Sequence, residues 1–403
     1  MKKTMIVAAL MALVATGANA KKAADSAEVA KNKPVFTVVK QNPITSIKDQ
    51  NRSGTCWAYS TLSYFESEIL KHTGKTYDLS EMFVANKTYM DRATMAVRMH
   101  GDVSFSQGGS AYDVLYALQH YGIVPEGAMP APGTLTGDSL ANFGEFFNVM
   151  TPYVEAVAKS NAKKISSAWK SGLQGIIDSY IGKTPEKFTY QGKQYTPQSF
   201  CQSLGLNLDD YVTITSYTHH PMWSKFAVEV QDNWRWPLSY NVPMDDLCKI
   251  IDNAINNGYT VAWGGDVTED GFTRKGLGIA YDVKKVRSMA GTDADHWFKL
   301  SKDEKKEKFD SLGVNAPEVV PTQAMRQEAF DNWETTDDHG MHIYGIAKDQ
   351  NGKEYYMVKN SWGEYGDYKG TWYMTKAFVA YKTMDFMVNK NAIPKDIRKK
   401  LGI

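Results

Sequence analysis

Three cysteines, Cys56, Cys201 and Cys248, are the candidate nucleophiles of this 403-residue sequence. A thiol becomes a good nucleophile when it loses its proton, and the positive end of a helix dipole favours that loss. Cys56 follows a polar loop, and the apolar residues after it, at spacings of four, three and four, predict a helix that begins there. Cys201 and Cys248 have no such setting, so we expect inert, buried side chains. Because the cysteines are few and their number is odd, we expect no disulfide framework.

The base must be an imidazole, because a Cys–His pair can exchange one proton and serve first the nucleophile and then the leaving amine. Of the eight histidines, His339 is the candidate, since it opens a predicted strand. His342 is the runner-up; it lies an odd number of positions away and should project from the opposite face of that strand. The pairs His339 with His342 and His219 with His220 lack partners at familiar zinc spacing, so we expect neither a metal site nor a cofactor.

A predicted β-hairpin decides whether His339 can meet Asn360, whose side chain could hold the imidazole in its productive tautomer. A loop centred just after Asp349 makes the two residues direct partners across the hairpin. A tight turn at Asn351-Gly352 would instead set Asn360 opposite Ile343, about 13 Å from His339 at roughly 3.3 Å per residue. The chemistry therefore requires a longer or bulged loop.

Gln50 lies six residues before Cys56 in a polar loop. Its side-chain amide and the backbone N–H of Cys56 could form an oxyanion hole, the pair of donors that stabilises the tetrahedral intermediate of acyl transfer. Further along, Gly108 and Gly109 precede another helical run, and a glycine pair lets a second backbone come close.

Four short stretches of the sequence together resemble the papain superfamily of cysteine peptidases. Within that superfamily the sequence is more similar to bleomycin hydrolase and bacterial aminopeptidase C, because Cys56 and His339 are 283 positions apart, against ~130–150 in papain itself. The likeness runs from about Asn42 to Pro394. The four stretches are Gln50 to Ala58, Gly108-Gly109, His339 to Met341 and Asn360 to Gly363.

The resemblance implies an α+β fold of the papain-like type, with a helical lobe, an antiparallel β lobe and a substrate cleft between them. It implies a cysteine peptidase that hydrolyses peptide bonds through a thioacyl-enzyme, and the hexamers of the family make a homo-oligomer an expectation. The implied catalytic residues are Cys56, His339, Asn360 and Gln50. Gly108 and Gly109 would bind the backbone of an extended peptide substrate, and Trp362 would shield the His339–Asn360 pair from water.

The end of the chain bears on which peptide bonds are cut. Family members end in a tail that reaches into the cleft and restricts them to trimming residues from N-termini. This sequence ends at Ile403 after a short basic segment, so endopeptidase activity stands beside the aminopeptidase activity that the family favours. A non-catalytic peptide-binding relative is the alternative function, and acyl transfer to an amine would use the same Cys–His logic.

Composition and the N-terminus set the context. Forty-six basic and 45 acidic residues give a net charge of +1, which does not favour nucleic-acid binding. Residues 1–20 have the basic start, short apolar run and small-residue cleavage site of a signal peptide, so we expect a periplasmic or extracellular protein without a stable membrane span. The predicted domains are a linker at 21–40, a helical catalytic lobe at 41–130, an inserted helical unit at 131–208 and a β lobe at 209–403.

Overall fold

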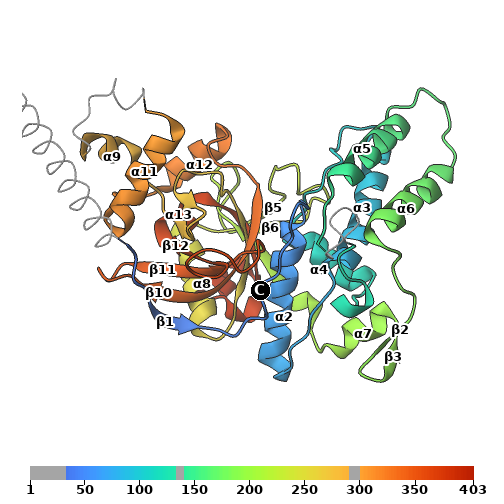
Figure 1. Cartoon of the computed structure of the whole chain (residues 1–403), viewed down its shortest axis with the longest axis horizontal. Helices are drawn as coiled ribbons and strands as arrows, with labels where there is room; N and C mark the ends of the chain where they lie inside the picture. Colours follow the sequence, from blue (N-terminus) through green and yellow to red (C-terminus); the bar gives the residue numbers. More distant parts are fainter. Residues whose placement is uncertain (1–32, 133–139, 290–299) are drawn as a thin grey trace, which may run out of the picture.

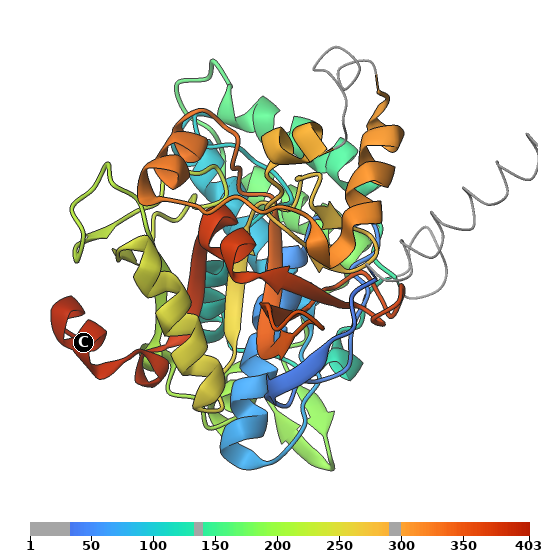
Figure 2. The ribbon, with the colours of Figure 1, turned by 90° about the vertical axis from the view of Figure 1, so that its left-hand side faces the viewer.

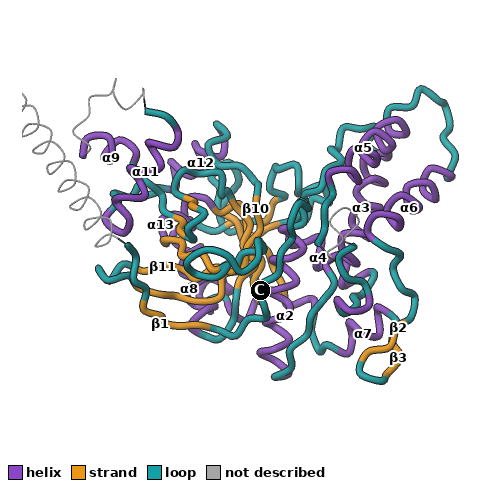
Figure 3. Tube along the Cα trace, in the orientation of Figure 1, coloured by secondary structure: helices purple, strands orange, loops and turns teal. Residues whose placement is uncertain are grey.

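The structure, a computed structural model, describes residues 33–132, 140–289 and 300–403. The predicted signal peptide and most of the predicted linker lie outside these described residues. Figure 1 shows a helical part on one side, a sheet-based part on the other, and helix α2 (Cys56–Thr73) between them. In Figure 3 nearly all strands gather in the sheet-based part, which confirms the predicted α+β class.

Helix α2 begins at Cys56, as the sequence pattern predicts. Gly74 ends the helix in the left-handed conformation, with a φ of 70°, which glycine adopts without strain. Its N–H donates to the Leu70 carbonyl. Every residue from Trp57 to Ile69 is buried, because one side of the helix packs on the sheet and the other packs on helices. Across the described ranges, none of the helices combines the length and the apolar character that crossing a membrane requires.

The rest of the helical part packs around a core of aromatic and aliphatic side chains. Ser80 caps its first helix: the Ser80 hydroxyl accepts a hydrogen bond from the Phe83 N–H at 3.1 Å. The elements are α3 (Glu81–Arg98), α4 (Ala111–His120), α5 (Gly144–Ala158), α6 (Ala168–Ile181), β2 (Phe188–Tyr190), β3 (Lys193–Tyr195) and α7 (Pro197–Ser203).

Helix α6 packs against the core of the helical part, with Trp169, Ile176 and Tyr180 partly buried against it. Helix α6 begins at Ala168, so Ile165 lies outside it and is 41% exposed. The fully buried residues of α6 are Leu173, Ile177 and Ile181, four positions apart, because this face is the one turned toward α3 and α5.

The sheet holds eleven strands within the described residues. Its order is β5-β6-β4-β13-β7-β10-β11-β12-β9-β8, and β1 pairs with β10 near the start of the chain. Neighbours are antiparallel except for two parallel pairs, β4 with β6 and β9 with β12. The strands are β1 (Thr37–Gln41), β4 (Tyr211–Thr215), β5 (Lys225–Phe226), β6 (Ser239–Asn241), β7 (Val261–Gly265), β8 (Phe272–Thr273), β9 (Leu277–Gly278), β10 (His339–Lys348), β11 (Glu354–Lys359), β12 (Thr371–Thr375) and β13 (Thr383–Asn389).

Helices flank this sheet. The long amphipathic helix α8 packs Leu247, Ile250 and Ile251 onto it, and Figure 2 shows the last helix of the chain beside α8 at the outer edge of the sheet-based part. Ser301 and Glu304 form a capping box at the start of α11. The helices are α8 (Met244–Asn256), α9 (Val283–Met289), α11 (Lys302–Leu312), α12 (Gln323–Asp331), α13 (Lys376–Lys382) and α14 (Lys395–Leu401). Single 3₁₀ turns lie at residues 126–128, 208–210, 313–315 and 390–392.

The β10–β11 hairpin has the longer, bulged form that the predicted chemistry requires. A five-residue loop follows the last pair, Lys348 with Glu354, and a bulge between Ile343 and Gly345 shifts the register by one residue. At the other end His342 pairs with Lys359, and continuing that register would set Asn360 opposite Met341 rather than His339. The predicted direct pairing is therefore wrong by two positions, because the loop is centred on Asn351 rather than just after Asp349, which shifts the register by three positions, and the bulge reverses only one of them.

Candidate active site

Cys56 is the first residue of α2, and its side chain lines a cavity of about 250 Å³ between the helical and sheet-based parts. The first N–H groups of a helix have no partner within it, so that of Cys56 is available to a ligand. The cavity is also lined by Trp57, Gly108, Gly109, His339 and Gly340. The structure thus brings Cys56 and His339, which are 283 positions apart in the sequence, into one cavity.

The surroundings of Cys56 disfavour a lone negative charge. Burial raises the pKa of its thiol to about 12, and the backbone N–H groups of Gly340 and Trp57 oppose that shift without cancelling it. The thiol therefore stays protonated at neutral pH until an adjacent base accepts its proton.

His339 is buried and bonded to Asn360, with 2.8 Å between His339 Nε2 and Asn360 Oδ1. The Ser361 N–H also donates to Asn360 Oδ1 at 2.8 Å, which fixes the amide with its oxygen toward the ring. Nε2 must then carry the imidazole proton, and Nδ1 is left with its lone pair. Burial lowers the pKa of His339 to about 4, although the bond to Asn360 raises it, so the ring is neutral at pH 7.

The Trp362 ring covers the His339–Asn360 pair. Its centroid lies 4.9 Å from that of the His339 ring, and its other edge packs against Trp372 at 5.5 Å. This is the position from which an indole excludes water from the imidazole.

His342 projects from the opposite face of β10, as its odd spacing from His339 predicts. Its Nδ1 lies 2.9 Å from Ser63 Oγ, and its ring lines a separate small cavity with Lys359 and Glu66. Burial lowers its pKa well below the usual value, and the nearby Lys359 charge adds to that shift. Only His339 of the two shares the cavity of Cys56.

Gln50 is buried, and its amide is held at both ends. Ser361 Oγ donates to its Oε1 at 2.6 Å, and its Nε2 donates to the Ser53 carbonyl at 2.7 Å. An amide nitrogen carries two hydrogens, so one N–H remains for a ligand. Gln50 is not among the residues that line the cavity.

The glycine pair lies against two side chains that leave no room for a Cβ atom. A Cβ on Gly109 would lie 2.8 Å from the Trp57 ring, and one on Gly108 would lie 1.8 Å from Asp232 Oδ2. The Gly108 carbonyl already accepts a hydrogen bond from Arg92 Nη1 at 2.6 Å. Of the two glycines predicted to bind a peptide backbone, Gly108 therefore already uses its carbonyl in a hydrogen bond within the protein.

Sequence reasoning missed the acidic side chains of the cavity. Its lining includes Asp232, Asp337, Asp338 and Asp385, and Arg92 lies just behind Asp232. Burial raises the pKa of Asp337 well above its usual value, and the charges of Asp232 and Asp385 add to the shift. Asp337 and Asp338 precede His339 and could have been suspected from that position, but no local pattern marks Asp232.

A loop that we call the clasp loop, residues 228–236, carries Asp232 from the sheet-based part onto the helical part. Arg92 Nη1 lies 3.0 Å from Asp232 Oδ1, and Arg235 bonds Asp113 at 2.6 Å and Asp91 at 2.7 Å. Trp234 between them is 2% exposed. The clasp loop therefore joins the two parts directly across the cavity.

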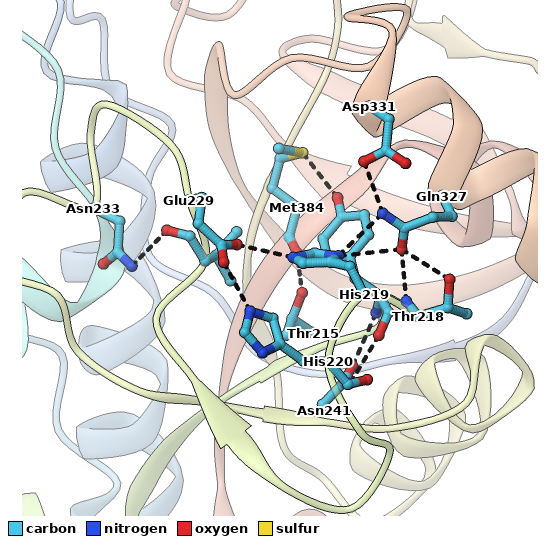
Figure 4. Close-up of polar contacts among 12 residues, drawn as sticks. Thr215, Thr218, His219, His220, Glu229, Asn233, Asn241, Gln327, Asp331 and Met384 are labelled. Atoms are coloured by element: carbon cyan, nitrogen blue, oxygen red, sulfur yellow. Dashed lines mark hydrogen bonds and ion pairs between the residues drawn. The ribbon is translucent and has the colours of Figure 1, made fainter.

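Glu229 in the clasp loop lies against the His219-His220 pair, which corrects the expectation that these histidines lack a partner (Figure 4). Its two oxygens lie 3.0 Å from His219 Nε2 and 2.8 Å from His220 Nε2. Gln327 donates to Asp331 and to His219 Nδ1, so Nε2 of His219 can donate to Glu229. Hydrogen bonds alone thus account for this group, and it ties the clasp loop to α12.

Comparisons with known proteins identify the family and the fold. A model described as "Peptidase C1-like family" matches residues 3–402. The chain is 23% identical to Aminopeptidase G of Lactobacillus delbrueckii subsp. lactis over 89% of its length and 84% of that protein, and 24% identical to Aminopeptidase C of Lactobacillus helveticus over 90% and 85%. Bleomycin hydrolase of Gallus gallus is 21% identical, over 87% of this chain and 81% of that one. The crystal structure of pepw from Lactobacillus rhamnosis has the same fold, with a TM-score of 0.68, 20% identity and coverage of 94% of this chain and 86% of that chain.

Proposed function

Because this chain belongs to the peptidase C1-like family, whose relatives above are named aminopeptidases, we propose that it is a cysteine aminopeptidase that works through Cys56, His339 and Asn360. The observation that carries the proposal is the 2.8 Å bond between His339 Nε2 and Asn360 Oδ1, beside the cavity that Cys56 lines. That bond leaves His339 Nδ1 as a bare acceptor for the thiol proton.

The reaction begins when the Cys56 thiol gives its proton to His339 Nδ1 and the sulfur attacks the carbonyl carbon of the peptide bond. The carbonyl oxygen becomes an oxyanion, and the Cys56 N–H and the remaining N–H of Gln50 are its donors. His339 then returns the proton to the leaving amine as the C–N bond breaks, which leaves a thioacyl-enzyme. Water, deprotonated by His339, attacks this thioester, and the thiol is restored when the acid product leaves.

Replacing the nucleophile tests this proposal. We expect Cys56→Ala to abolish hydrolysis of a peptide with a free N-terminus while the thermal unfolding temperature stays within a few degrees of wild type, because the substitution removes a single sulfur atom. A thiol-directed alkylating inhibitor should inactivate the wild-type enzyme with a stoichiometry of one. The measurements are initial rates of peptide cleavage and the mass of the alkylated protein.

Cys201 provides the matched control. It is a second free cysteine, buried, with its Sγ 3.6 Å from the Leu118 carbonyl and outside the cavity. Cys201→Ala should keep full activity and the single alkylation. Residual turnover in Cys56→Ala, or a wild-type protein that binds peptide and is never alkylated at Cys56, would refute the peptidase and favour a binding protein. Transfer of the acyl group to added amines in preference to water would favour an acyltransferase.

A further inference from the structure

The acidic and basic side chains that line the catalytic cavity are unbalanced. Four aspartates line it, and its lining contains no lysine or arginine among the described residues. Two of these carboxylates accept hydrogen bonds from the protein: Asp338 from the Val267 N–H at 2.9 Å, and Asp385 from Ser239 Oγ at 3.4 Å. Asp232 and Asp337 are the two carboxylates left to consider as ligands for a substrate.

Arg92 can neutralise only one of the two remaining carboxylates. Its side chain is fully buried, and every one of its donor positions is used: toward Ser104, Gly108, Gln231 and Asp232. Within the described part of the chain, the Asp337 carboxylate accepts no hydrogen bond and forms no ion pair. Burial and the neighbouring carboxylates raise the pKa of Asp337, so its carboxyl group favours the protonated form in the empty cavity, and a cation bound beside it would favour its ionisation.

Asp232 is held in place before any substrate arrives. Arg92 and Ser106 bind one of its oxygens, Oδ1, at 3.0 and 3.3 Å, and Oδ2 faces Gly108. Figure 4 shows how the loop itself is fastened: Glu229 bonds the two histidines, and Asn233 Nδ2 donates to the Val228 carbonyl at 2.9 Å. A carboxylate fixed in this way does not lose conformational entropy when it binds a ligand.

Asp232 lies next to the glycine pair. Its Oδ2 occupies the space directly beside Gly108, one residue from the Gly109 backbone. Together with Asp337 it lines both the catalytic cavity and a neighbouring pocket of about 750 Å³. An extended peptide that lies along the glycine pair would bring one end close to this carboxylate.

We propose that Asp232 and Asp337 bind the α-ammonium group of the substrate's N-terminal residue and so restrict the enzyme to free N-termini. This inference rests on the proposed peptidase function and deepens it. An ammonium group offers three donors and one positive charge, which matches Asp232 Oδ2 and the two unpartnered oxygens of Asp337. An acetylated N-terminus or an internal segment would bury both carboxylates without a cation, which is costly.

The chain's own C-terminal helix does not supply this anchor. In α14 the side chains of Ile397 and Leu401 pack into the core of the sheet-based part, and Lys400 lies over the Trp223 ring at 4.4 Å. No residue of α14 lines the cavity.

The test compares one tetrapeptide with a free N-terminus and the same peptide with an acetylated N-terminus. Wild type should have a much higher kcat/KM for the free peptide. Asp337→Asn and Asp232→Asn should each lower that kcat/KM by about 30-fold, mainly through KM, as the loss of one buried charge pair does. The kcat/KM for the acetylated peptide should stay unchanged or rise. An unchanged ratio of the two values in either variant would overturn the proposal.

Two further measurements separate this proposal from the proposed function. Glu334→Gln removes a carboxylate from the same segment that does not line the cavity, and it should leave both kcat/KM values unchanged. Calorimetric titration of Cys56→Ala with the two peptides tests the anchor without turnover, and tighter binding of the free peptide is expected. If wild type cleaves neither peptide but this difference in binding persists, the peptidase is refuted and the anchor stands; equal binding refutes the anchor alone.

Discussion

Burial shifts the pKa values of Cys56 and His339 in opposite directions, to about 12 for the thiol and about 4 for the imidazole. Both shifts favour the uncharged pair, so a thiolate and an imidazolium form together or not at all. A bound substrate changes this balance, because the oxyanion donors stabilise the negative charge only once it has moved to the substrate oxygen. The resting site is therefore neutral, and charge develops during the attack.

At the residue scale, His342 should make folding stability depend on pH. It is neutral and buried, and its folded pKa lies well below the 6.5 of the unfolded chain. Above pH 6.5 neither state holds the proton and its stabilising effect is complete; as the pH falls through 6.5, only the unfolded state takes the proton, so stability is lost. The expected slope for this one group is about 1.4 kcal/mol per pH unit.

The measurement is urea unfolding of wild type and His342→Gln between pH 7 and pH 5. Glutamine can keep the bond to Ser63 but does not titrate, so the variant should lose less stability on acidification. The difference between the two proteins is needed because Glu68, whose pKa burial raises to about 7, acts in the opposite sense over this range. Parallel pH profiles would show that His342 is not the group responsible.

At the scale of single elements, local sequence patterns predicted those features that local interactions determine, such as the start of a helix. The start of α2 at Cys56 and its end at Gly74 follow from apolar spacing and one glycine. The register of His339 against Asn360 was predicted wrongly, because it depends on a loop centred on Asn351 and on a bulge after Ile343, where β10 pairs with β11 on one side and with β7 and β1 on the other. Pairing partners that come from distant parts of the chain leave no local pattern.

The contact of β10 with α2 gives an element-scale prediction. A Cβ on Gly340 would lie 2.7 Å from Ser60 Oγ and 3.3 Å from both the Cys56 carbonyl oxygen and Trp57 Cα. Gly340→Ala should push the strand, and His339 with it, away from the helix. We expect a loss of about 100-fold in kcat/KM, as a displacement near 1 Å produces, and of about 1–3 kcal/mol in stability.

Gly175→Ala is the control for that substitution. Nothing lies within 4 Å of a Cβ at Gly175, which sits inside α6, so alanine should leave activity unchanged and stabilise the helix slightly. Peptide cleavage rates and thermal unfolding temperatures check both variants. If Gly340→Ala retained wild-type kcat/KM, close contact between β10 and α2 would not be what positions His339.

At the scale of the whole molecule, the sequence predicted the papain-like class and the four stretches that meet at the cavity, but not its charge. Asp232 reaches the glycine pair only because the clasp loop crosses from one part of the molecule to the other. Its partner Arg92 lies 140 positions earlier. Nothing in the residues around either side chain indicates that they will be neighbours.

The predicted export of the protein also belongs to this scale. We propose that residues 1–20 are removed and that the mature chain begins at Lys21. The expected result is an exported protein whose N-terminal peptide, measured by mass spectrometry after expression in the native cell, starts at that lysine. Recovery of the full-length chain from the cytosol, with Met1 or Lys2 at its start, would refute this.

The clasp loop also bears on which substrates would suit this enzyme. It joins the two parts of the molecule beside the cavity through the ion pairs Arg92–Asp232 and Arg235–Asp113. A requirement for a free α-ammonium group at Asp232, as proposed above, would favour loose chain ends over the surface loops of folded proteins. Such an enzyme would degrade fragments that other proteases make.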